Sequence, residues 1–292
     1  MLKPPYTRYD QLHVYNFDRT NLGEIDDPDL IGTWIEDNTA ILFFHKEKQA
    51  LVDTICARAE ATILYQAQLD YQDWEAGLDI TTFTVPPLTV VPLWEEQQLA
   101  KEDENIPIRL DPSVIFGSGF HPSTRLCLAV LTDLLTSHPK KIRTMVDLGT
   151  GTGLLSIGAA KLGVEEVRAY DNNPFACSVA EKNVALNSCQ KQIRVMETDL
   201  RNGLPDTGVD MVVANLYKSL LIDLFQNPDF WKAKYYLISG FIPSMEEELL
   251  ATLPMDQLKL LERRKSDIWC LWLLAKKAVE GRGMRHAVCG VR

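Results

Sequence analysis

Short runs of alternating hydrophobic and polar positions dominate the first third of the chain. Alternation over residues 12–17 predicts a strand, and residues 34–44 predict a hairpin. Apolar positions at helical spacing over 46–61 predict a helix, and residues 63–69 predict a further strand. This pattern is typical of a small mixed α/β domain, which we place over residues 1–93.

From residue 106 onward, predicted strands alternate with predicted helices. The strands fall at 143–148, 167–170, 193–197, 209–214, 235–239 and 268–274, and the helices at 125–135, 154–162 and 175–187. This alternation predicts a parallel, doubly wound α/β sheet. In such a sheet, ligands bind beyond the carboxyl ends of the strands. We place the second domain over residues 106–276.

Two further segments lack a core pattern. Residues 94–105 are polar and acidic, which predicts a solvated linker with some helical character. Residues 277–292 carry several basic side chains without periodicity, which predicts a frayed basic tail.

The amino-acid composition indicates which kinds of binding partner suit the chain. The 292 residues include 30 Lys and Arg against 40 Asp and Glu, a net charge of −10. Such a chain is a poor binder of nucleic acid and a suitable partner for a basic protein. We expect no membrane span, because no apolar run approaches the required length of about 18 residues. Six scattered cysteines and the lack of a signal peptide predict a cytoplasmic protein, which we expect to be a monomer.

A glycine-rich turn follows the predicted strand 143–148. It reads Gly-Thr-Gly-Thr-Gly over residues 149–153 and leads directly into a helix. Gly149 and Gly151 would let a ligand approach the backbone closely. The GxGxG spelling favours an amino acid with a nucleoside over a dinucleotide, and the alternative is a tight turn without a ligand.

Acidic residues follow the next two strands. Asp171 lies 22 residues after Gly149 (171 − 149 = 22), at the tip of the second strand of the unit. A carboxylate there accepts hydrogen bonds from both hydroxyls of a ribose. The alternative is a helix start, at which Asn173 serves as the N-cap. Asp199, after the third strand, is placed to accept from the exocyclic amine of a nucleobase, or it is a solvated loop acid.

Two more segments complete the candidate site. Asn215 stands in Ala-Asn-Leu-Tyr at the end of the fourth strand, where its amide can position an amine; the alternative is a turn-forming Asn. Residues 111–124 form a glycine- and proline-containing loop of the kind that closes over ligands. Within it, Ser123 or Thr124 is expected to cap the following helix, and His121 to pack in the loop rather than to act as a base. No cluster predicts a metal site.

These segments together resemble the class I S-adenosylmethionine-dependent methyltransferases, and more narrowly the ribosomal protein L11 methyltransferase (PrmA) family. The run DPSVIFGSGFHPSTRLCLAVL is similar to that family's DPGxAFGTGTHPTTxLCL, and VDLGTGTGLLSIGAAKLG to its LDLGCGTGILAIAALKLG. DNNPFACSVAEKNVALN and VVANLYKSLL also match family segments. The resemblance covers residues 106–274, and TWIEDN and YQDWEAG extend it weakly into the first domain.

The resemblance implies a Rossmann-like methyltransferase domain and a ferredoxin-like N-terminal domain that recognises the ribosomal protein. It implies S-adenosyl-L-methionine as cofactor and lysine or N-terminal amines of protein L11 as acceptors. Asn215 would be the catalytic residue. Family cofactor contacts fall on Thr124, Gly149, Asp171 and Asn215, with Phe116 and Gly117 closing over the methionine end.

The sequence also departs from the family. Residues 18–30 lack the pattern of the first N-terminal helix, and Trp74 is followed by Glu-Ala-Gly instead of leading to a second Trp. These departures keep open a methyltransferase of another protein or a small amine, and a cofactor-binding assembly protein without turnover. Nucleic-acid methylation is disfavoured by the net charge of −10 and by ANLY, which lacks the paired prolines of the NPPY motif.

Overall fold

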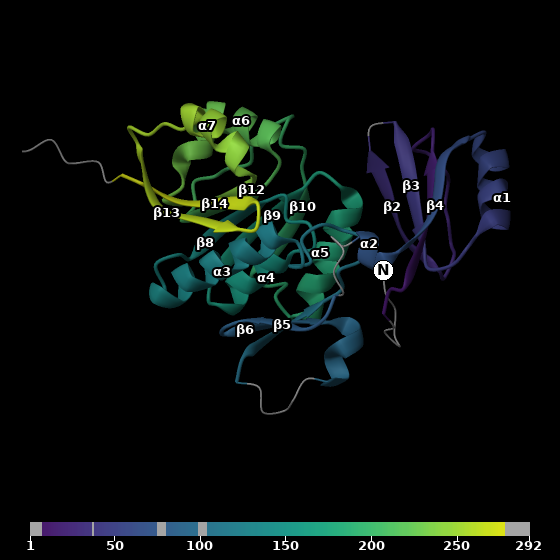
Figure 1. Ribbon diagram of the computed structural model, residues 1–292, viewed down its shortest axis with the longest axis horizontal. Coiled ribbons are helices and arrows are strands. Elements are labelled where there is room, and N and C mark those ends of the chain that lie inside the picture. The colour runs from purple at the N-terminus through teal and green to yellow at the C-terminus, as the bar shows by residue number, and fades with distance from the viewer. Residues whose placement is uncertain (1–7, 37, 75–79, 99–103, 278–292) are drawn as a thin grey trace, which may run out of the picture.

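The computed structural model describes residues 8–36, 38–74, 80–98 and 104–277. A smaller N-terminal unit stands beside a larger C-terminal unit (Figure 1). The N-terminal unit is an antiparallel sheet in the order β2-β3-β1-β4, the strand order of a ferredoxin-like fold. Its elements are β1 Gln11–Phe17, β2 Leu30–Glu36, β3 Thr39–Phe44, α1 Gln49–Ala59, β4 Ile63–Asp70 and the single-turn α2 Tyr71–Trp74.

The two faces of this sheet have different partners. On β1, Leu12 and Val14 belong to a cluster shared with the C-terminal unit, whereas Tyr15 and Phe17 pack with residues of α1. Successive side chains of a strand point to opposite faces, so a strand with both faces covered is buried throughout its centre. The sheet therefore lies between α1 and the larger unit.

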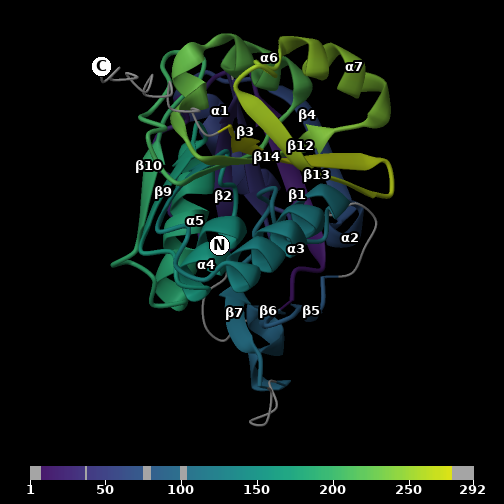
Figure 2. The same cartoon turned by 90° about the vertical axis from the view of Figure 1, so that its left-hand side faces the viewer.

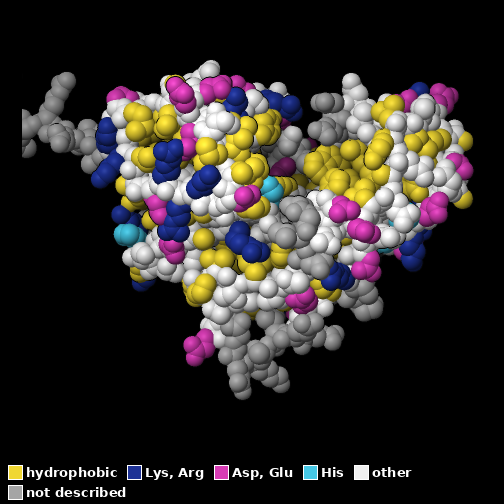
Figure 3. Space-filling model, in the orientation of Figure 1, with side chains coloured by type: hydrophobic (Ala, Val, Ile, Leu, Met, Phe, Trp, Pro, Cys, Tyr) yellow, Lys and Arg dark blue, Asp and Glu magenta, His cyan; other side chains and the backbone are white. Residues whose placement is uncertain are grey.

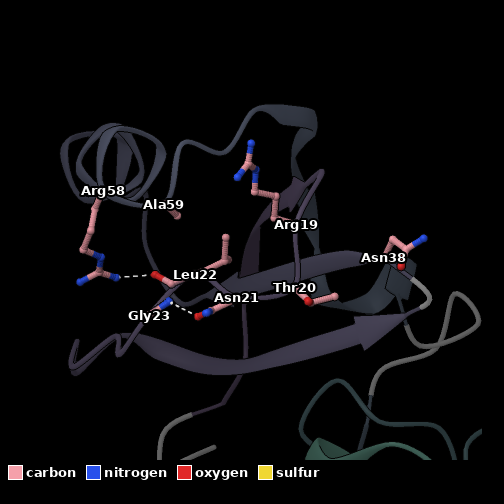
Figure 4. Close-up of a pocket in the computed structure, with 8 residues that line it drawn as sticks. All are labelled: Arg19, Thr20, Asn21, Leu22, Gly23, Asn38, Arg58 and Ala59. Carbon is pink, nitrogen blue, oxygen red and sulfur yellow. Dashed lines mark hydrogen bonds between the residues drawn. The ribbon is translucent and has the colours of Figure 1, made fainter.

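A loop held by hydrogen bonds, residues 18–29, stands where the ferredoxin-like pattern has its first helix. Residues 18–29, all described, contain no helix, as the sequence indicated. The Arg58 guanidinium of α1 donates instead to the carbonyls of Leu22 and Glu24, and Asn21 accepts from the Gly23 amide (Figure 4). The loop walls a hollow of about 520 Å³ that also includes Arg19. We interpret this hollow as structural, because the Arg58 donors are used to hold the loop.

The larger unit is built on a seven-stranded sheet in the order β10-β9-β8-β11-β12-β14-β13. The first five strands are parallel, as predicted, but β14 and β13 run antiparallel. The predicted parallel sheet is confirmed for these five strands, whereas the antiparallel edge was not predicted. The strands are β8 Thr144–Leu148, β9 Glu166–Asp171, β10 Ile193–Glu197, β11 Met211–Asn215, β12 Tyr235–Phe241, β13 Leu258–Ser266 and β14 Trp269–Lys276.

Helices cover both faces of this sheet, which confirms the doubly wound α/β class (Figure 2). Met145 of β8 packs among residues of α3 and α4, while its neighbour Val146 packs among residues of α6 and α7. No helix of the described residues is long and apolar enough to cross a membrane. The helices are α3 Pro122–Ser137, α4 Leu154–Lys161, α5 Pro174–Leu186, α6 Lys218–Gln226, the short η2 Pro228–Lys232 and α7 Pro243–Thr252.

A third sheet joins segments on both sides of the predicted linker. It contains β5 Phe83–Val85, β6 Leu88–Pro92 and β7 Ile106–Leu110, with β6 and β7 paired in parallel. Both strands pack into the same core as α3 and α4. The linker prediction falls on η1 Leu93–Gln98, and residues 99–103 lie outside the described residues, as does 278–292 of the predicted tail. The proposed domain bounds stay a prediction.

Candidate functional site

A cavity of about 740 Å³ opens at the carboxyl ends of the parallel strands. This is where the crevice rule places ligands of a doubly wound sheet. Its wall includes six of the residues selected from the sequence: Phe116, Gly149, Gly151, Asp171, Asp199 and Asn215. Gly117 and Thr124 lie behind the wall, where they bond to Thr152 and Asn215 respectively. The structure thus brings all eight residues into one region.

The glycine turn after β8 needs its glycines for a specific reason. Gly151 has φ +55, and a Cβ on it would stand 2.2 Å from the carbonyl oxygen of Phe116. The amide of Thr152 donates to that same carbonyl at 3.1 Å, and the Thr152 hydroxyl donates to Gly117 O at 2.6 Å. The turn and the loop 111–124 are therefore locked together.

Asp171 ends β9 with its carboxylate on the cavity wall. One oxygen accepts from the Gly151 amide at 3.0 Å and the other from the Asn173 amide at 3.0 Å. Burial raises the pKa of this carboxyl, and the backbone amides partly offset the effect. Asn173 caps α5 by accepting from the Phe175 amide, which confirms its predicted capping role.

Asp199 lines the cavity, and its carboxylate already forms an ion pair with Arg201. Its two oxygens accept from Arg201 Nε at 3.0 and 3.2 Å, and its Oδ2 also accepts from Arg201 Nη2 at 3.0 Å and from Asn202 Nδ2 at 3.1 Å. The hydrogen bonds from Arg201 lower the pKa of Asp199. A nucleobase amine would have to share this carboxylate with Arg201, so the predicted role of Asp199 stays a prediction.

Asn215 ends β11, and only the Nδ2 of its side-chain amide forms hydrogen bonds with the described residues. Its Nδ2 donates to Ser123 Oγ at 3.2 Å and to Thr124 Oγ1 at 3.3 Å. Its Oδ1 is buried and has no hydrogen-bond partner in the part of the chain that the structure describes. A buried acceptor without a donor costs free energy, so this atom is suited to receive a donor from a ligand.

His121 packs in the cavity wall. Its ring lies 4.8 Å from that of Phe116 and 4.6 Å from that of Trp269, and its Nδ1 lies 2.8 Å from Ser123 Oγ. Burial lowers the pKa of His121, which keeps the imidazole neutral near pH 7. The expectation that Ser123 or Thr124 caps α3 is wrong, because His121 is the N-cap and accepts from the Ser123 amide. Pro122 begins the helix, a position where its missing N–H costs nothing.

Sequence reasoning missed several residues of the wall. Trp34 and Ile35 reach it from β2 of the N-terminal unit, and Trp269 from the start of β14. Gly240 has φ +93, and a Cβ there would stand 2.1 Å from the Leu216 carbonyl beside Asn215. The available signal for Gly240 was a glycine directly after the predicted strand 235–239, at the carboxyl end where ligands bind. No local signal marks the others.

The topology and this site define a class I methyltransferase: a glycine turn after β8, an acid at the tip of β9 and an Asn at the tip of β11 surround one crevice. The family model "Ribosomal protein L11 methyltransferase (PrmA)" matches residues 32–277. The chain belongs to this family. The predicted fold and family are thereby confirmed, and the family implies use of S-adenosylmethionine.

Individual relatives carry the same family name. A ribosomal protein L11 methyltransferase of Carboxydothermus hydrogenoformans is 34% identical over 220 residues, covering 73% of this chain and 69% of the relative. One of Pediococcus pentosaceus is 37% identical over 177 residues, covering 60% and 54%. A crystal structure of ribosomal protein L11 methylase from Lactobacillus delbrueckii subsp. bulgaricus superposes with a TM-score of 0.57 at 27% identity, covering 68% of this chain and 99% of that one.

The match to the Pediococcus protein spans about half of that relative's length. Family membership identifies the chain as a protein methyltransferase by descent. Its substrate and the roles of its residues are argued separately below.

Proposed function

We propose that this chain transfers methyl groups from S-adenosyl-L-methionine to lysine or N-terminal amines of ribosomal protein L11. Family membership and the names of the relatives support the reaction and the acceptor. The observation that carries the proposal is the buried, unpartnered Oδ1 of Asn215 on the cavity wall.

The chemistry of the cavity wall supports binding of the cofactor. The Asp171 carboxylate stands at the cavity wall, at the tip of β9, where a ribose would be held. We place the methionine end near Phe116, Gly117 and Thr124. When bound, S-adenosylmethionine supplies a methyl group that already carries a good leaving group. The residues of the chain therefore have to align, desolvate and position the acceptor.

Asn215 would hold the acceptor amine. Its Oδ1 accepts a hydrogen bond from the amine N–H, while Ser123 and Thr124 keep its Nδ2 from rotating into that position. A lysine must be neutral to attack, although its usual pKa is about 10.4. Burial lowers the pKa of an amine, and the aromatic wall of Phe116, Tyr217 and Trp269 provides an apolar setting. The released proton passes to water, so no dedicated base is required.

The surface supports a protein acceptor. Hydrophobic side chains gather over the strands of the N-terminal unit (Figure 3), and Tyr65 of β4 is 59% exposed. Exposed apolar patches of this kind mark interaction sites. The net charge of −10 favours a basic partner over nucleic acid. We propose that the chain works as a monomer in the cytoplasm.

Intact-mass spectrometry of purified protein L11 tests the proposal. Incubation with the wild-type chain and S-adenosylmethionine should raise the mass in whole methyl units. Asp171→Ala should abolish the increase, whereas Asp223→Ala, which removes an exposed carboxylate on α6, should leave it unchanged. An unchanged mass of L11 together with calorimetric cofactor binding would reject this acceptor and point to another protein or a small amine.

A further inference from the structure

A buried carboxylate joins the two units of the molecule. Asp111, which follows β7, is fully buried, and its Oδ1 accepts from the Tyr9 hydroxyl at 2.9 Å. Its Oδ2 accepts from Lys182 Nζ of α5 at 2.6 Å. Tyr9 belongs to the N-terminal unit, so one carboxylate is shared between both units. A charge-assisted hydrogen bond of this kind is among the stronger ones, and removal of one partner from a buried carboxylate is costly.

The N-terminal unit holds the following residues of the same loop as well. The Tyr71 hydroxyl donates to the Ser113 carbonyl, and the Trp74 indole N–H donates to the Val114 carbonyl at 3.1 Å. Three side chains of the smaller unit therefore donate hydrogen bonds to residues 111–114.

This segment leads straight into the cofactor cavity. Two residues after Val114, the carbonyl of Phe116 accepts from the Thr152 amide, and Gly117 accepts from the Thr152 hydroxyl. At the other end, the Asn183 amide bonds to the Asp111 amide and carbonyl and to the Thr152 carbonyl. The loop 111–117 is thus a strap: its first residues are held by both the smaller unit and α5, and its last residues by the glycine turn.

We propose that the N-terminal unit is part of the cofactor site, with Tyr9 as a positioning residue that holds the strap through Asp111. This inference rests on the proposed cofactor site. The unit supplies Trp34 and Ile35 to the cavity wall and sets the position of Phe116 through its three donors. By linkage, cofactor binding and docking of the N-terminal unit must strengthen each other equally.

Calorimetry of S-adenosylmethionine binding to the full chain tests this coupling. Tyr9→Phe removes only the hydroxyl, and we expect cofactor affinity to fall about five- to tenfold. Tyr15→Phe is the matched control, because Tyr15 of β1 is as buried as Tyr9 but its hydroxyl accepts from the Lys48 amide on the α1 side. It should leave the affinity unchanged even where it lowers Tm. Trp74→Phe, which removes the donor to Val114, should act like Tyr9→Phe.

Hydrogen exchange provides a readout that needs no cofactor. Amides of residues 113–117 should exchange faster in Tyr9→Phe than in Tyr15→Phe at equal global stability. Equal cofactor affinity in the wild-type and Tyr9→Phe chains would overturn the inference alone, as would equal losses in both Tyr variants. Failure of the wild-type chain to bind the cofactor would overturn the proposed function together with it.

Discussion

The side-chain amide of Asn215 lies 3.3 Å from the hydroxyl of Thr124, although 91 residues separate them in the chain. This contact joins the tip of β11 to the first turn of α3, and so joins two of the segments that resemble the methyltransferase family. Because Thr124 and Ser123 together engage the Nδ2, the buried Oδ1 is left as the acceptor without a partner among the described residues. The pair therefore fixes the orientation of the residue to which we assign the acceptor amine.

Asn215→Ala should lower kcat for methylation of L11 by about 100-fold or more, because a misplaced nucleophile costs rate on that scale. Cofactor affinity should fall far less than kcat, because the proposed catalytic role of Asn215 concerns the amine, although the family resemblance also places Asn215 among the cofactor contacts. Single-turnover kinetics and calorimetry separate these two effects. Asn227→Ala, which removes the N-cap of η2, is a control that should retain turnover. Wild-type turnover by Asn215→Ala, with unchanged cofactor affinity, would reject the assignment.

Alanine substitutions at two glycines with positive φ can separate the cost of backbone strain from the cost of a clash between the added Cβ and a neighbouring group. Gly151 and Gly163 have φ of +55 and +100, but a Cβ meets the Phe116 carbonyl at 2.2 Å in the first and nothing within 4 Å in the second. Gly163→Ala should cost about 1–2 kcal/mol of stability without an effect on cofactor affinity. Gly151→Ala should in addition displace Phe116 and weaken cofactor binding. Thermal unfolding and calorimetry on both variants check this, and similar affinities in the two would contradict it.

The sequence is sufficient to predict site residues whose position is set by the strand that they end. Asp171 and Asn215 each end a strand, and parallel strands bring such tips to one edge, so strand recognition was sufficient to place them together. Trp34 belongs to the other unit, and its approach depends on docking of two surfaces that no local pattern encodes. The edge strand β13 was missed for a related reason: its residues alternate between half-buried and exposed and carry Lys, Glu and Arg, so its pattern is that of a solvated segment.

The buried carboxyl of Asp147 should make stability depend on pH. Burial raises its pKa from the ordinary 3.8 to about 6, although Thr150 and Ser156 both donate to it. The folded protein thus holds this proton more tightly than the unfolded chain. The resulting stabilisation is complete below about pH 3.8 and is lost as the pH rises through about 6, a change of about 3 kcal/mol.

Asp147→Asn keeps an acceptor for both hydroxyls and removes the titration. Urea unfolding should therefore show the variant gaining stability relative to wild type between pH 4 and pH 7.5. Asp210→Asn is the control of opposite sign: burial raises the pKa of Asp210, but donors that include Lys234 outweigh it and lower the pKa to about 2. The contacts of ionised Asp210 stabilise the wild type fully above about pH 3.8 and are lost as the pH falls through about 2. Asp210→Asn should therefore be less stable than wild type above pH 3.8, and the difference should shrink as the pH falls below that value. A pH-independent difference between wild type and Asp147→Asn would contradict the first expectation.

Methylation of L11 should depend on ionic strength through the encounter between the two proteins. The chain carries a net charge of −10, and long-range attraction to a basic protein raises the association rate more than the affinity. Salt screens such attraction over about 10 Å at 0.1 M. The apparent KM for L11 should therefore rise between low and moderate salt. The KM for S-adenosylmethionine should stay nearly constant, because we propose that it binds inside the cavity. Steady-state kinetics with each substrate varied in turn measure both quantities, and a flat response of the L11 KM would show that net charge plays no part in recognition of the acceptor.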